Sequence, residues 1–232
     1  TVTVGSSANL TQNDDIVTKT INVYGNLIQN DSILGSSGAT MYIGDGATYK
    51  YVGGTNNTLI QGITDGDGTF EIASDYGNSD AIGGGNGLAT IKVDSGANFT
   101  LGNDIYANNI SVLGRLTLGN YPRTIHGSIS VSSGGIIDLG GSSHSLTGSL
   151  TTVANSIIML SADSTSAGNL TAEGILTIAS NGKLKVSITN EESITSGTKF
   201  AIFTGASGST INTISSSNID VSESGSNKVG SL

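Results

Sequence analysis

The sequence of 232 residues contains no cysteine, no tryptophan and only one proline. Without cysteine the chain forms no disulfide and offers no thiolate to a metal ion. Charged residues make up 12% of the chain, about half the usual share, and aromatic residues make up 5%. No run approaches the roughly 20 apolar residues that span a bilayer as a helix. Packing and backbone hydrogen bonds must therefore supply the stability of the fold.

The few charges are mostly acidic, with 18 Asp and Glu against 9 Lys and Arg and a formal net charge of −9. Nucleic-acid binding needs clustered basic side chains, so nucleic acid is excluded as a partner. Glycine occurs 34 times, and together with Ser, Thr and Asn it disfavours helices. Hydrophobic residues still reach 36%, which is enough to fill a core. We expect an all-β protein.

A short pattern repeats along the chain: two strands of alternating apolar and polar residues, joined by a corner of small residues. Clear copies start at Ile91, Ile110, Ile129, Leu150 and Leu176, in steps of 19, 19, 21 and 26 residues, and looser copies start at Val2, Ile21, Met41 and Ile63. Coils of this length stack identical positions about 4.8 Å apart. The repeat predicts a right-handed parallel β-helix (β-solenoid) of about nine or ten rungs with a C-terminal cap.

No charged or proline-rich linker interrupts the pattern, so we expect a single domain over residues 1–232. Residues 73–88 break the period with a polar, glycine-rich stretch that predicts a loop insertion, and residues 188–232 predict terminal rungs and a cap. The chain starts at Thr1 without a leader-like segment. We therefore expect it to be a fragment of a longer protein.

Several runs resemble the passenger regions of bacterial autotransporter (type V secreted) surface proteins. They are most similar to rickettsial surface-cell-antigen passengers. These runs are INVYGNLIQND, IYANNISVLGRLTLGN and ITSGTKFAIFTGASG. The resemblance implies a β-helical stalk secreted through the outer membrane to the bacterial cell surface. It also implies a C-terminal β-barrel translocator in the parent protein, and a host cell-surface protein or glycan as the partner.

The chain offers little for catalysis. Its only two histidines, His126 and His144, occupy different positions relative to the repeat, and the Gly- and Ser-rich sequence around each predicts a solvated corner. No Ser-His-Asp or GxSxG arrangement of recognisable spacing occurs. We do not expect an enzyme, and we expect no cofactor.

An alternative is a carbohydrate-active β-helix enzyme acting on polysaccharide, because such folds place carboxylates beside Arg or Lys on one face. Arg115 and Arg123 fall in neighbouring rungs, with Asp104 and Asp138 not far along the chain. Tyr106 and Tyr121 are the aromatic residues nearest those arginines. Turnover of acidic polysaccharide would establish this alternative.

Two further sets of residues are candidates for binding. The inserted stretch 73–88 contains Asp75, Tyr76 and Asp80, which we take as the contact residues because binding concentrates in loops on rigid scaffolds. A weak calcium site is suggested by Asp65, Asp67 and Glu71, whose oxygens alternate along the chain, although the spacing fails the EF-hand pattern. The leading hypothesis is a surface-exposed passenger stalk acting as an adhesin or structural module in host-cell interaction.

Overall fold

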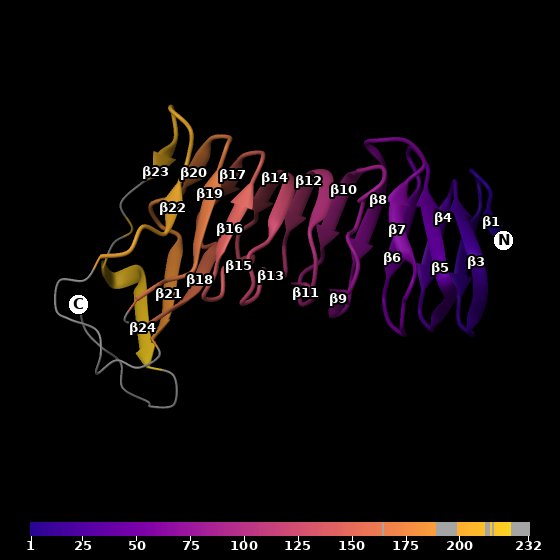
Figure 1. The fold of residues 1–232 in the computed structure, drawn as a ribbon, viewed down its shortest axis with the longest axis horizontal. Coiled ribbons are helices and arrows are strands. Elements are labelled where there is room, and N and C mark those ends of the chain that lie inside the picture. The colour runs from indigo at the N-terminus through magenta and orange to yellow at the C-terminus, as the bar shows by residue number, and fades with distance from the viewer. Residues whose placement is uncertain (164, 189–198, 212–213, 215, 224–232) are drawn as a thin grey trace. The chain divides into compact units, whose positions relative to one another are not determined.

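The computed structural model describes residues 1–163, 165–188, 199–211, 214 and 216–223. The chain divides into two compact units, Thr1–Ser111 and Val112–Leu232. Each unit is built from stacked parallel strands, seen side by side in Figure 1. Among the described residues no helix has the length and apolar character to cross a membrane.

The first unit contains three sheets. The first sheet has the strands β1 (Val2–Val4), β3 (Ile16–Val23), β5 (Ile33–Ile43) and β7 (Leu59–Gly62), in that order. The second sheet runs through β2 (Asn9–Gln12), β4 (Asn26–Gln29), β6 (Thr48–Tyr51), β8 (Asp67–Ile72), β10 (Leu88–Val93) and β12 (Ile105–Val112). The third sheet pairs β9 (Tyr76–Asn78) with β11 (Asn98–Leu101).

The second unit continues the same organisation. One sheet contains β13 (Arg115–Thr117), β15 (Ile136–Asp138), β18 (Ile157–Ala162), β21 (Lys183–Ile188) and β24 (Ile219–Glu223). The long strand β14 (Thr124–Val131) begins two runs: β16 (Ser143–Leu146), β19 (Asn169–Ala172) and β22 (Phe203–Thr204), and beside them β17 (Leu150–Thr152), β20 (Leu176–Ile178) and β23 (Thr210–Ile211). A short 3-10 helix, Ser216–Asn218, precedes β24.

The register confirms the predicted parallel β-solenoid. Ile129 pairs with Leu150 and Leu150 with Leu176, the positions that the repeat aligns. The strands make about eight turns, fewer than the nine or ten predicted. The copies do not all start on one sheet: Met41 pairs with Ile60 in the first sheet, whereas Phe70 pairs with Ile91 in the second.

The predicted terminal cap, 188–232, is described only in part. Its described strands β22, β23 and β24 extend the sheets of the second unit by pairing with β19, β20 and β21. Within residues 199–205, only Phe203–Thr204 is a strand. The described part of this region is therefore a terminal turn of the solenoid.

Alternating side chains build the core, as the period-two pattern requires. The inward column Tyr49, Phe70 and Ile91 is fully buried, and the rings of Tyr49 and Phe70 stack with centroids 5.0 Å apart. Polar side chains also point inward where their hydrogen bonds are satisfied. Gln29 is fully buried and its amide nitrogen donates to the carbonyl oxygens of Gly53 and Thr55, at 3.2 and 3.1 Å. These hydrogen bonds replace the ones that the Gln29 amide would make to water, so burying it does not destabilise the turn.

Candidate functional site

Residues 73–88 form part of a turn, which corrects the predicted loop insertion. Residues 76–78 are β9, and Ile82 forms an isolated parallel bridge with Ile105. The side chain of Tyr76 is only 8% exposed, and its ring lies 5.2 Å from that of Phe70 and 5.9 Å from that of Phe99. Burial raises the pKa of the Tyr76 phenol far above its ordinary value. Tyr76 is a core residue and not the surface contact that the sequence suggested.

The two other candidate contacts in this segment, Asp75 and Asp80, are exposed. A carboxylate oxygen of Asp75 accepts a hydrogen bond from the backbone nitrogen of Asn98, at 3.0 Å. The hollow lined by Asp80, Tyr76 and Asn78 has a volume of about 10 Å³, which holds no more than one water molecule. The segment therefore presents two carboxylates on a closed surface and no ligand pocket.

The three residues considered for calcium lie in different environments. Asp65 accepts a hydrogen bond from the backbone nitrogen of Gly87, and Asp67 accepts one from Thr64 at the turn before β8. Glu71 lies further along β8, between two lysines. Within the described ranges, no group of three or more His, Cys, Asp or Glu side chains is arranged to hold a metal ion.

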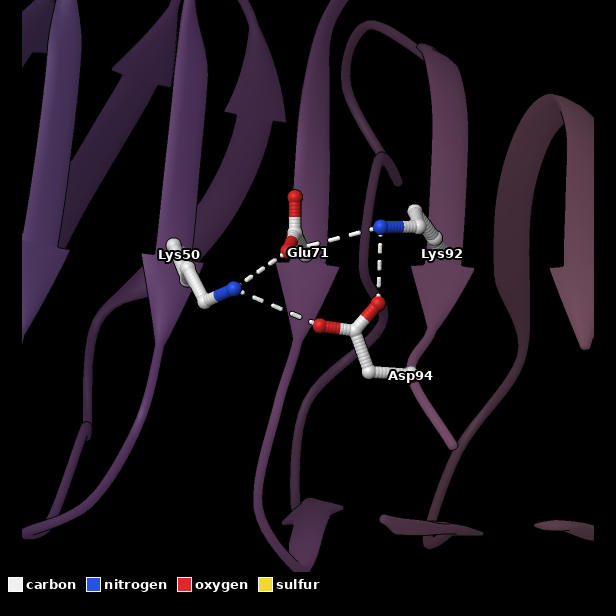
Figure 2. Close-up of polar contacts among 4 residues, drawn as sticks. All are labelled: Lys50, Glu71, Lys92 and Asp94. Atoms are coloured by element: carbon white, nitrogen blue, oxygen red, sulfur yellow. Dashed lines mark hydrogen bonds and ion pairs between the residues drawn. The ribbon is translucent and has the colours of Figure 1, made fainter. Parts of the chain in front are cut away.

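The lysines around Glu71 belong to a four-residue ion-pair network on the outer face of β6, β8 and β10 (Figure 2). Lys50 Nζ lies 2.5 Å from Glu71 and 3.3 Å from Asp94. Lys92 Nζ lies 2.7 Å from Asp94 and 3.5 Å from Glu71. Strand register places Lys50, Glu71 and Lys92 directly above one another.

Proton affinities follow this geometry. The hydrogen bond to Glu71 raises the pKa of Lys50, and the hydrogen bond to Asp94 raises the pKa of Lys92. Although partial burial acts in the opposite direction, the hydrogen bond from Lys92 lowers the pKa of the Asp94 carboxyl. The network contains two lysines and two carboxylates, so its formal charges cancel. The network joins three turns and offers no net charge to a ligand.

Removing the central carboxylate with Glu71→Gln should lower the free energy of unfolding by about 0.5–1 kcal/mol in low salt. The effect is small because the side chains are partly exposed, and it should shrink in high salt, which screens exposed pairs. Urea unfolding at two salt concentrations measures it. Glu173→Gln is the matched control, because exposed Glu173 has no ion pair among the described side chains. A loss that is the same for both variants, or independent of salt, would contradict the network's role.

Both histidines lie in strands rather than in the solvated corners that the sequence suggested. His126 is half-buried in β14, and His144 is 2% exposed in β16. The Nε2 atom of His144 lies 2.8 Å from the carbonyl oxygen of Leu139, and its Nδ1 atom has no hydrogen-bond partner in the part of the chain that the structure describes. Burial lowers the pKa of the His144 imidazole and outweighs the hydrogen bond with Leu139, which raises it; the nearby Arg123 lowers it further, and Asp138 raises it.

This burial predicts a pH-dependent stability. The folded-state pKa of His144 lies below the ordinary value of about 6.5, so the unfolded chain binds the proton more readily. The contribution to stability is complete above that ordinary value and is lost as the pH falls through the folded-state pKa. His144→Gln retains a donor for the Leu139 carbonyl but does not titrate. Thermal melts from pH 7 down to pH 5 should show a shallower loss of stability for this variant than for the native chain or His126→Gln. Equal slopes in all three would contradict the assignment.

The arginines are engaged with other side chains of the second unit. Arg115 forms an ion pair with Asp138, and the Arg123 guanidinium lies 5.9 Å from the centroid of the Tyr121 ring. Tyr121 is 71% exposed. Asp104 and Tyr106 belong to the first unit, so the arginine-centred grouping of the sequence is divided between the two units.

The apolar pattern of the repeat did not predict one feature of the surface. Outward hydroxyl side chains stack over four strands of the second unit: Ser130 pairs with Thr151, Thr151 with Thr177, and Thr177 with Thr210. Ser130, Thr151 and Thr210 are exposed and Thr177 is half-buried. The signal was present in the aligned copies, one residue after each apolar start. We call this set the hydroxyl column.

No family model, no curated protein and no solved structure matches the chain. The assignment of the chain as a parallel β-solenoid rests on the strand register alone.

Proposed function

We propose that the chain is part of a bacterial autotransporter passenger, exposed at the cell surface, where it acts as an adhesin or structural module in host-cell contact. The observation that supports this most is the in-register stacking of turns, which makes continuous outward columns such as the hydroxyl column. A solenoid of this kind displays a long surface on a rigid support. Exposed residues such as Asp75 and Asp80 vary the surface chemistry along that support.

The electrostatics of the described side chains favour surface contact over polysaccharide cleavage. Cleavage of acidic polysaccharide needs carboxylates and cations that are free to meet substrate. Glu71 and Asp94 are instead neutralised by lysines, and Asp138 by Arg115. We therefore retain the binding role as the proposal and treat cleavage as the alternative to be tested.

Binding of the fluorescently labelled chain to intact host cells tests the proposal. We expect saturable binding that is lost when the chain is heat-unfolded. Deleting residues 73–88 is unsuitable as a probe because it removes β9 and the bridge at Ile82. Asp75→Ala with Asp80→Ala is the better probe, and exposed Asp45→Ala is its control. Absence of saturable binding, or release of reducing ends from polysaccharide, would overturn the proposal.

A further inference from the structure

A polar pocket of about 240 Å³ opens on the second unit. Its lining residues come from one corner of successive turns: Asn120 follows β13, Gly141 follows β15, Ser161 and Ala162 end β18, and Asp163 and Ser166 belong to the loop before β19. The volume is below the roughly 300–1,000 Å³ typical of drug-sized ligands. The pocket therefore suits a compact polar molecule.

Two adjacent glycines keep this corner open. Gly140 has a φ of +57°, and a Cβ there would lie 2.3 Å from the carbonyl oxygen of Gly119, so no larger residue fits. At Gly141 a Cβ would meet only the Cβ of Ser161, at 3.9 Å. The space in front of Gly141 is thus empty because this residue has no side chain, and not because the backbone is strained.

The polar groups of the pocket are fixed in position. Asn120 accepts a hydrogen bond from the backbone nitrogen of Gly141 through its Oδ1 atom, at 3.3 Å. Asp163 Oδ1 accepts hydrogen bonds from the backbone nitrogens of Thr165 and Ser166, at 2.7 and 2.8 Å. The bond from Thr165 contributes most to lowering the pKa of Asp163 to about 2. The carboxylate is therefore ionised, and its Oδ2 atom has no hydrogen-bond partner among the described residues.

Among the residues that the structure describes, no Lys or Arg side chain lines the pocket. Arg123 lies over the Tyr121 ring, and Arg115 is paired with Asp138. An anionic ligand would meet the uncompensated charge of Asp163 and be repelled.

We propose that this pocket binds one neutral pyranose ring, with Asp163 Oδ2 and Asn120 meeting its hydroxyl groups. Hydroxyl donors match an unpaired carboxylate oxygen, and the volume of the pocket suits a single sugar ring. This inference rests on the proposed adhesive function and names its ligand class as a neutral glycan.

Saturation-transfer NMR with the purified chain tests the pocket directly. The probes are the methyl glycosides of glucose, galactose, mannose and N-acetylglucosamine, with methyl glucuronide as the acidic comparator. We expect weak, saturable binding of at least one neutral probe and none of the glucuronide. Gly141→Leu fills the pocket and should weaken binding at least tenfold, which is about 1.4 kcal/mol. Gly5→Leu is the control, because a Cβ at exposed Gly5 meets nothing within 4 Å.

Asp163→Asn provides a second variant that keeps the Oδ1 acceptor but replaces Oδ2 by a donor, and it should also weaken binding. Neutral sugars that fail to bind, or bind Gly141→Leu as tightly as the native chain, overturn the pocket. Host-cell binding that survives Gly141→Leu unchanged rejects the pocket as the adhesive site while leaving the adhesive function intact. Sugar binding without host-cell binding has the opposite meaning: the pocket stands and the adhesive function fails.

Discussion

Val112→Asp should lower the free energy of unfolding by about 4 kcal/mol or more, the range reached when a charge is buried without a partner. Val112 is fully buried, and its carbonyl oxygen accepts the backbone hydrogen bond of Ser132 on the next turn. Water cannot reach an aspartate at this position without opening the stack. Urea unfolding of the purified variant measures the loss.

The neighbouring residue supplies the control for this prediction. Ser111 precedes Val112 in β12 and faces the other way, so Ser111→Asp should change the free energy of unfolding by no more than about 0.5 kcal/mol. Similar losses at both positions would contradict the assigned alternation of inward and outward side chains.

Phe70→Ala should cost about 3–5 kcal/mol, because it removes a large buried ring and leaves a cavity. The Phe70 ring stacks on that of Tyr49 and contacts that of Tyr76 edge-on, with centroids 5.0 and 5.2 Å apart. The effect should appear in the same urea measurement. Tyr24→Ala is the aromatic control, because Tyr24 is 45% exposed and should lose about 1 kcal/mol or less. Equal losses would mean that the aromatic cluster is not packed as described.

The apolar columns were predictable because they depend on local alternation and on a repeat length that the sequence displays. Ile129, Leu150 and Leu176 occupy the same position in their copies and pair in the structure. Strands of period two with small-residue corners leave few other ways to bury these side chains. The fold class followed from this pattern without any single diagnostic motif.

Individual sites were harder to predict, because cross-turn partners decide their environments. Tyr76 lies in a polar, glycine-rich stretch, and only its pairing with Phe99 identifies it as a core residue. Glu71 resembled a calcium ligand within its own segment, whereas lysines on the turns before and after it hold its carboxylate. His144 did carry a local signal, since it alternates with buried Leu146 in the sequence Ser-His-Ser-Leu. The serines on both sides suggested a corner instead.

The proposed surface functions all depend on each turn stacking on the next in the observed register. The chain has no cysteine. Any disulfide within a double-cysteine variant therefore joins the two introduced residues and reports this stacking. Thr151 and Thr177 are register partners, and neighbouring strands lie about 4.8 Å apart, within the Cα separation that a disulfide accepts. Ser130 and Thr177 are two strands apart in the same column, about 9.6 Å.

Mild oxidation of the purified double variants, followed by electrophoresis without reductant, is the most direct test of this stacking. We expect Thr151→Cys with Thr177→Cys to form an intramolecular disulfide rapidly in the folded chain. Ser130→Cys with Thr177→Cys should remain reduced under the same conditions. Failure of the first pair to close, or equally rapid closure of both pairs, would contradict the stacked register on which the proposed surface depends.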